Sequence, residues 1–232
     1  MKQIDEIKKK LEWEQFYDPD FDWHNYWRDW ELYGYANDAA IFLSENFIRE
    51  FKENIDWQVV CRYSKLSEDF IREFKDVVDW KIISAYQKLS EDFIREFKDV
   101  FDVVDWKIIS AYQKLSEDFI REFKDKVNWN CISSYQILSE NFIREFKKKV
   151  RWNYISANQK LSEDFIREFK DKVNWRYVSR DQKLSENFIR EFKDKVNWRY
   201  VCKFQTLSED FICEFIHEIK DNVKNHWKRI FK

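Results

Sequence analysis

The chain has 232 residues, of which 44% are hydrophobic, 37% charged and 19% aromatic, and it contains one glycine and one proline. This composition excludes intrinsic disorder and collagen-like or linker-rich designs. The net charge is −2, but residues 1–42 hold 5 basic and 10 acidic groups, whereas residues 151–232 hold 18 and 13. That asymmetry is weaker than the basic stripe expected of a dedicated nucleic-acid-binding protein.

Residues 1–42 are predicted to form a helical, aromatic N-terminal cap. An amphipathic helix is expected up to about Tyr17, and Asp18-Pro19-Asp20 begins another. The second helix has an aromatic stripe at helical spacing, which consists of Trp23, Tyr26, Trp27, Trp30 and Tyr33. We interpret the stripe as cover for the first repeat, and an aromatic cage for a cationic ligand is the alternative.

The polar start of the chain does not resemble a signal peptide, and no apolar run approaches the ~18 residues of a membrane helix. We therefore expect an intracellular, soluble protein without membrane contact. The four cysteines form no CxxC pair and are expected to be reduced packing residues. They are Cys61, Cys131, Cys202 and Cys213.

A Leu-Ser-Glu triplet recurs at intervals of 23 residues, with one interval of 26. It begins at Leu43, Leu66, Leu89, Leu115, Leu138, Leu161, Leu184 and Leu207. Such a period is typical of repeat architectures. It predicts an all-α fold, a right-handed-type α-solenoid of about eight two-helix repeats with helical caps at both ends. Residues 43–206 hold seven tandem repeats, and residues 207–232 hold the terminal repeat and a C-terminal capping helix.

The first helix of each repeat is predicted from the triplet, counting its leucine as position 1. Ser67, at position 2, is suited to be the N-cap, and Glu68 complements the helix dipole. The apolar positions 5, 6, 9 and 13 follow helical spacing, so the helix is expected to run to about position 13. On its outer face, Arg72 is expected to pair with Glu68 and Asp76, four residues away on either side.

The second helix is predicted to begin after the Asp or Asn found at position 14 of most repeats. A tryptophan opens it at position 15, and these tryptophans are Trp57, Trp80, Trp106, Trp129, Trp152, Trp175 and Trp198. Positions 15, 18, 19 and 22 share one face, which we expect to be buried between stacked repeats. Position 22 is glutamine in six repeats, as in Gln87. We expect these buried amides to tie helix ends or adjacent repeats together, and a ligand-binding ladder of amides is the alternative.

Two places depart from the period. A three-residue insertion near residues 99–103 is expected to lengthen or bulge the first helix of its repeat. After Leu207 the tryptophan is absent, and an apolar stripe predicts one long closing helix. The stripe comprises Phe211, Phe215, Ile219, Val223, Trp227 and Ile230.

The repeat has a specific sequence, as in Leu66 to Phe74, Asp79-Trp80 and Ile83-Ser84. It resembles the tandem repeats of proteins encoded by amoeba-infecting giant DNA viruses of the mimivirus group. The resemblance covers residues 43 to about 215 and implies a viral repeat protein expressed in the host cytoplasm or viral factory. It implies no activity.

Catalytic chemistry has little support in the sequence. The chain contains only three histidines and one glycine, so a glycine-rich phosphate-binding loop is excluded. Cys213 and His217 have a zinc-chelating spacing on a predicted helix, but no second pair accompanies them. We predict no enzymatic activity, no cofactor and no metal site.

Positions 16, 17, 20 and 21 of the second helix vary while the packing positions hold. In the last copies these positions become basic and aromatic, and the candidate partner-binding residues are Arg176, Tyr177, Arg180, Arg199, Tyr200 and Lys203. If the second helices line the concave side, these residues form a groove for an acidic peptide or a phosphate backbone. Drift on a solvated face is the alternative.

Three hypotheses follow for the role of the chain. The first is a non-enzymatic scaffold or adaptor for protein–protein interaction, which favours an acidic segment of another protein. The second is nucleic-acid binding by the basic C-terminal half, and the third is a self-assembling structural component.

Overall fold

The computed structural model describes residues 43–100 and 106–222, which form short helices joined by turns and contain no strand. The chain divides between Phe42 and Leu43 into two units. The aromatic cap predicted for residues 1–42 lies outside the described residues. Within the described ranges, no helix has the length and apolar character needed to cross a membrane.

Two kinds of helix alternate along the chain. The first helices are α3 (Glu45–Phe51), α5 (Glu68–Glu73), α7 (Glu91–Glu96), α10 (Glu117–Glu122), α12 (Glu140–Glu145), α14 (Glu163–Glu168), α16 (Glu186–Glu191) and α18 (Glu209–Glu214). The second helices are α4 (Trp57–Tyr63), α6 (Trp80–Tyr86), α9 (Trp106–Tyr112), α11 (Trp129–Tyr135), α13 (Trp152–Asn158), α15 (Trp175–Asp181) and α17 (Trp198–Phe204). A last helix, α19 (Ile216–Asn222), follows α18. The predicted all-α solenoid of tandem helix pairs is confirmed.

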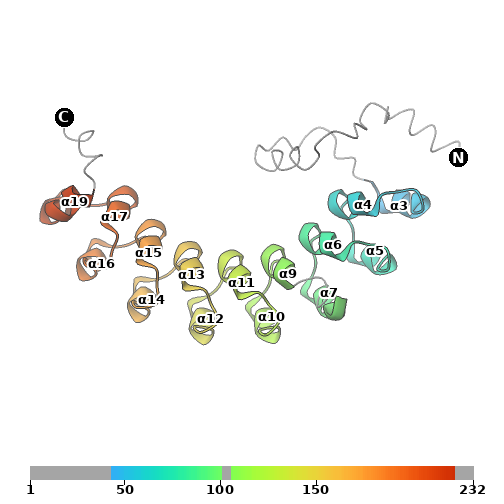
Figure 1. Ribbon diagram of the computed structural model, residues 1–232, viewed down its shortest axis with the longest axis horizontal. Coiled ribbons are helices and arrows are strands. Elements are labelled where there is room, and N and C mark those ends of the chain that lie inside the picture. Colours follow the sequence, from blue (N-terminus) through green and yellow to red (C-terminus); the bar gives the residue numbers. More distant parts are fainter. Residues whose placement is uncertain (1–42, 101–105, 223–232) are drawn as a thin grey trace, which may run out of the picture. The chain divides into compact units, whose positions relative to one another are not determined.

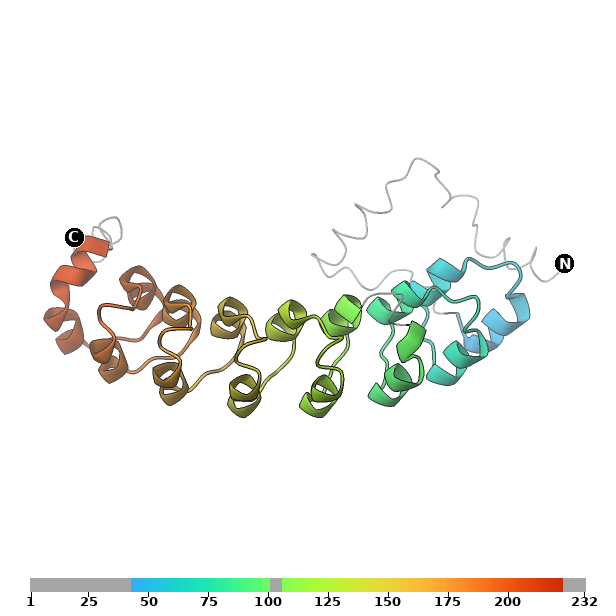
Figure 2. The ribbon, with the colours of Figure 1, turned by 60° about the horizontal axis from the view of Figure 1, so that its bottom comes forward.

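The helices form two rows. Each second helix packs against the second helix of the next repeat, from α4 to α17, and α19 packs against α17. The first helices form the other row (Figures 1 and 2). Every described repeat therefore has its main partners in its immediate neighbours, as in other quasi-one-dimensional arrays.

The first helix is shorter than predicted. Ser67 caps α5 by accepting a hydrogen bond from the amide of Phe70, as expected, but α5 ends at Glu73. Phe74 leaves the helical conformation with φ −109° and ψ 24°, and a turn follows in which the amides of Val77 and Val78 donate to its carbonyl. The turn returns the chain to the second helix, and Val78 still reaches the core.

The core contains one aromatic cluster at each junction between repeats. The ring of Trp80 lies 4.7 Å from Phe97 and 6.2 Å from Phe93, both in the next repeat, and those two phenylalanines lie 4.7 Å apart. The ring of Trp80 is half-buried, and its indole N–H donates to the carbonyl of Lys75 at 2.9 Å. The tryptophans therefore stabilise the contact between consecutive repeats by packing against its phenylalanines, at distances favourable for aromatic pairs.

Each glutamine at position 22 bridges two repeats. The side-chain amide of Gln136 donates to the carbonyls of Ser110 and Gln113, and its oxygen accepts from the amide of Leu115. The same three-bond arrangement, which we call the glutamine bridge, is made by Gln87, Gln113, Gln136, Gln159, Gln182 and Gln205. The amides are saturated by the protein itself, so the expected structural role is confirmed. No Leu-Ser-Glu triplet precedes the first repeat in the sequence, and Ser64 replaces the glutamine there.

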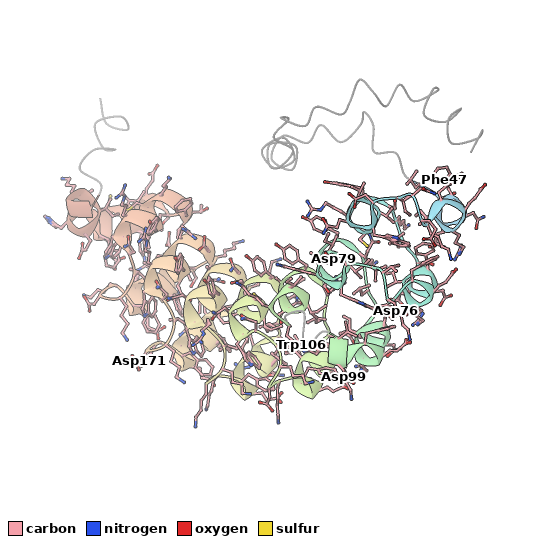
Figure 3. All side chains as sticks on the ribbon, turned by 45° about the vertical axis from the view of Figure 1, so that its right-hand side comes forward. Phe47, Asp76, Asp79, Asp99, Trp106 and Asp171 are labelled. Atoms are coloured by element: carbon pink, nitrogen blue, oxygen red, sulfur yellow. The ribbon has the colours of Figure 1, made fainter. Side chains whose placement is uncertain are left out.

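The first helices are joined by polar contacts on their outer side. Arg72 donates to Glu96 of the next repeat at 2.8 Å and contacts Glu68 and Asp69 of its own helix. It pairs with these groups rather than with Asp76, which lies in the turn beyond the end of α5 (Figure 3). The resulting arginine–glutamate ladder comprises Arg49–Glu73, Arg72–Glu96, Arg95–Glu122, Arg121–Glu145, Arg144–Glu168, Arg167–Glu191 and Arg190–Glu214.

The glutamate at position 3 caps the helix of the following repeat. Glu186 accepts from the backbone amide of Ser208 at 2.6 Å, and that bond lowers the pKa of Glu186 below its ordinary value. Because the folded pKa lies below the unfolded one, the stabilisation is complete above the unfolded value of about 4.3 and disappears as the pH falls through the folded value.

We expect Glu186→Gln to reduce the loss of stability on acidification below about pH 4, since the titrating group is removed. Urea unfolding at several pH values and carboxyl NMR titration measure this effect. Glu209→Gln is the matched control, because Glu209 occupies position 3 of the last repeat, with no following triplet. A titration midpoint for Glu186 at or above about 4.3 contradicts the expectation.

The structure corrects both expectations about the irregular places. Helix α7 has six residues, like every other described first helix except α3, and the insertion falls in the connection after it. Residues 98–100 of that connection are helical, and residues 101–105 lie outside the described residues. At the C-terminal end, α18 stops at Glu214 and α19 starts at Ile216, so the described part of the closing segment is two helices. Phe215 breaks the helix with φ −107° and ψ 28°, the backbone geometry that also ends α5, α7, α10, α12, α14 and α16. Val223, Trp227 and Ile230 lie outside the described residues.

Candidate partner-binding surface

The six predicted partner-binding residues lie on two adjacent helices, α15 and α17. Arg176, Arg199 and Lys203 are exposed, and Tyr177, Arg180 and Tyr200 are half-buried. We call this set the basic–aromatic cluster. The packing residues beside the cluster are buried as in the other repeats. Val178 and Val201, both at position 18, are fully buried.

Arg176 and Tyr200 connect the two helices of the cluster. The Arg176 guanidinium donates to the Tyr200 hydroxyl from Nε at 3.2 Å and from Nη2 at 2.9 Å. Its carbon Cζ lies 5.5 Å from the centre of the Tyr200 ring. The contact holds one guanidinium and one ring side by side. Within residues 43–100 and 106–222, no carboxylate forms an ion pair with Arg176.

Arg180 is held within its own helix. Its Cζ lies 4.9 Å above the Tyr177 ring, and its Nε donates to Asp181 at 2.8 Å. The hydrogen bond to Asp181 raises the pKa of the Arg180 guanidinium. Asp181 was not among the predicted residues, although its position next to Arg180 in the sequence could have indicated this ion pair.

Phe204 is a second residue that the sequence analysis missed. It is 47% exposed at the end of α17, its ring stacks with Tyr200 at 6.0 Å, and Lys203 Nζ lies 5.1 Å from its centre. Position 21 carries tyrosine in the first four repeats, so an aromatic residue there was a readable signal. The cluster thus has an exposed apolar edge beside its charges.

A different surface continues along the earlier second helices. Tyr112 and Tyr135 are each 68% exposed, and Ile137, just after α11, is 90% exposed. Lys81 and Lys107 stand at position 16 in the second and third repeats, where Arg176 and Arg199 stand later. The exposed side chains of the second helices therefore change along the chain, from lysine and tyrosine in the early repeats to arginine and tyrosine in the sixth and seventh. The glutamine bridges between the repeats stay the same.

A hollow of about 560 Å³ opens between α11, α13 and α15. Its lining consists of Asn130, Arg151, Trp152, Asn153, Tyr154, Ala157, Asn158, Tyr177 and Arg180. Tyr177 and Arg180 belong to both the hollow and the basic–aromatic cluster, so the two adjoin. Apart from Trp152, which was predicted to be a packing residue, the rest of the lining was not predicted. Arg151 was a readable signal, because it stands at position 14, where the other second helices follow Asp or Asn.

The cysteines occupy varied environments. Cys61 and Cys202 replace the buried serine of position 19, and desolvation raises the pKa of Cys202 to about 11. Cys131 is buried, as expected, but Cys213 is exposed because it stands where the other first helices carry the ladder arginine. Cys213 and His217 lie on different helices, α18 and α19, and no group of three or more metal-ligating residues occurs in the described parts of the chain.

No protein-family model, no curated protein and no solved structure matches the chain. The resemblance to repeats of the mimivirus group therefore stays a prediction, and the chain's role is inferred from its own residues.

Proposed function

We propose that the protein is a non-enzymatic scaffold that binds an acidic segment of another protein through the second helices of its sixth and seventh repeats. The observation that carries this proposal is the contrast between two sets of positions. Glutamine bridges and buried core residues recur from repeat to repeat, whereas positions 16, 17, 20 and 21 change and gather charge and aromatic rings in α15 and α17.

Charge supports an acidic partner. The cluster holds Arg176, Arg180, Arg199 and Lys203 (+4), and the adjacent Asp181 (−1) reduces the sum to +3. Arginine and tyrosine are the residue types enriched in the energetically important parts of protein interfaces. Rings already held beside guanidiniums lose little conformational freedom when a partner binds, which favours affinity.

The end of the array weighs against the self-assembling component as a head-to-tail polymer. In the last repeat Cys213 replaces the arginine that would extend the arginine–glutamate ladder to a following copy. This loss removes the contact by which a following copy would continue the ladder.

Selection from a display library of random dodecapeptides tests the proposed function. We expect wild-type protein to enrich acidic sequences, and we expect Arg176→Glu with Arg199→Glu to abolish that enrichment, because like charges then face the peptide. A 12-nucleotide single-stranded RNA and a 12-base-pair DNA are tested beside the peptides at ~50 mM salt, since phosphate contacts weaken steeply as salt rises.

The control variant is Lys81→Glu with Lys107→Glu, which makes the same charge change at the same repeat position in the second and third repeats. It is expected to keep the enrichment. Selection of neutral sequences, or equal loss in both double variants, contradicts the proposal. Binding of either oligonucleotide more tightly than any selected peptide replaces it with the nucleic-acid hypothesis.

A further inference from the structure

The hollow between α11, α13 and α15 has the composition of a binding site for an anion. Two guanidiniums, three carboxamides and two tyrosines line it, and none of the lining residues is acidic. Its volume of about 560 Å³ falls within the roughly 300–1,000 Å³ of ligand pockets. We infer that this hollow binds an extended acidic peptide segment, with its carboxylates on Arg151 and Arg180. The inference rests on the proposed function and extends it to residues outside the basic–aromatic cluster.

Arg151 is the main evidence for this site, because it stands at an N-cap position without making a capping hydrogen bond. Asn128 accepts the amides of Asn130 and Cys131 at the start of α11, and Asn174 does the same at the start of α15. Arg151 takes that place before α13 and makes no side-chain capping bond. Arg151 therefore departs from the capping pattern of the neighbouring repeats, and departures of this kind are expected at functional positions.

Arg151 is also held in position for a ligand. Its Nε donates to Asn130 Oδ1 at 2.7 Å, which parallels the bond from Asn174 Nδ2 to Asn153 Oδ1 at 2.9 Å one repeat later. The bond to Asn130 uses one edge of the guanidinium and pairs its charge with a neutral amide. A carboxylate can then receive the remaining N–H groups in a charge-assisted contact.

The other lining residues favour peptide over nucleic acid. Asn153 and Asn158 present carboxamides, which both donate to and accept from a peptide backbone. Arg151 and Arg180 supply +2, and Asp181, paired with Arg180, supplies −1, which leaves +1. One net charge suits a carboxylate or two better than a phosphate chain, which brings one charge with every nucleotide.

The substitution Arg151→Asn separates binding from folding. It installs the residue found at this position in the neighbouring repeats, so it should restore the cap and raise the unfolding midpoint by about 2–4 °C. We expect the same change to weaken binding of a fluorescein-labelled peptide of six Glu-Ser units about tenfold, as measured by anisotropy at ~50 mM salt. A peptide of six Gln-Ser units should bind neither protein.

Lys148→Asn is the matched control, because it removes the same charge from an exposed residue that does not line the hollow. It should leave the affinity within about twofold. A peptide that binds Arg151→Asn as tightly as wild type, yet is lost on Arg176→Glu with Arg199→Glu, overturns the hollow as the site and leaves the proposed function intact.

The remaining outcomes are equally distinct. If wild-type protein fails to bind the Glu-Ser peptide at millimolar concentration, this inference is wrong, and the display selection alone decides the proposed function. If a 12-nucleotide oligouridine binds more tightly than the peptide and is weakened by Arg151→Asn, the site binds phosphate and the peptide assignment is overturned.

Discussion

Gln136→Ala is expected to lower the free energy of unfolding by about 3–5 kcal/mol, because it leaves three buried backbone groups without partners. Gln136 is 6% exposed, donates to the carbonyls of Ser110 and Gln113 at 3.0 and 2.8 Å, and accepts from Leu115 at 3.0 Å. Urea unfolding followed by circular dichroism measures the loss.

Two further variants test the explanation. Gln58 is an exposed glutamine at position 16, and Gln58→Ala should change the free energy of unfolding by less than about 0.5 kcal/mol. Gln136→Glu keeps an acceptor for Leu115 but loses both donors and introduces a buried charge, so it should be at least as damaging as alanine. A loss below about 1 kcal/mol for Gln136→Ala would mean that water replaces the bridge.

Phe142→Ala is the second change with a large expected effect, a loss of about 3–5 kcal/mol. The Phe142 side chain is fully buried, its ring lies 4.7 Å from Phe146 and 6.3 Å from Trp129, and the Arg121 guanidinium lies 5.1 Å from its centre. Alanine opens a cavity between two repeats. Because contacts reach only adjacent repeats, the unfolding transition should also broaden as the two sides separate.

Phe204→Ala is the control for this prediction. Phe204 is 47% exposed, so truncation should lower the free energy of unfolding by less than about 1 kcal/mol and leave the transition sharp. Equal effects of the two variants, or an unbroadened transition for Phe142→Ala, would contradict the local character of the contacts.

Local patterns were sufficient to predict the two-helix repeat. Capping by Ser67 and Asp79 depends on residues within three positions, and the burial of Ile83, Ser84 and Gln87 follows from helical spacing. Those features are set within one turn of the chain. That the buried glutamine amides are hydrogen-bonded could also be predicted, because burying an unpaired amide is unfavourable.

Contacts between repeats were not predictable in the same way. Arg72 has acidic residues three and four positions away, yet its shortest bonds include one to Glu96, which is 24 residues distant. Spacing within a helix cannot rank such partners, because their distance depends on how the helices pack. The role proposed for Arg151 could not be predicted for a related reason, because it depends on the hollow that the neighbouring helices form.

The glutamine bridge has a consequence for how this protein changes over generations. Gln136 reaches back to Ser110 and Gln113 and to nothing beyond, so both sides of a unit already match any neighbour of the same kind. Residues 80–99 and 106–125 are identical, as expected of copying within the gene. Gain or loss of 23 codons can therefore alter the number of repeats while the glutamine bridges between the remaining repeats are kept. Mutation at positions 16, 17, 20 and 21 can then change the surface of each new copy, on which the proposed binding depends.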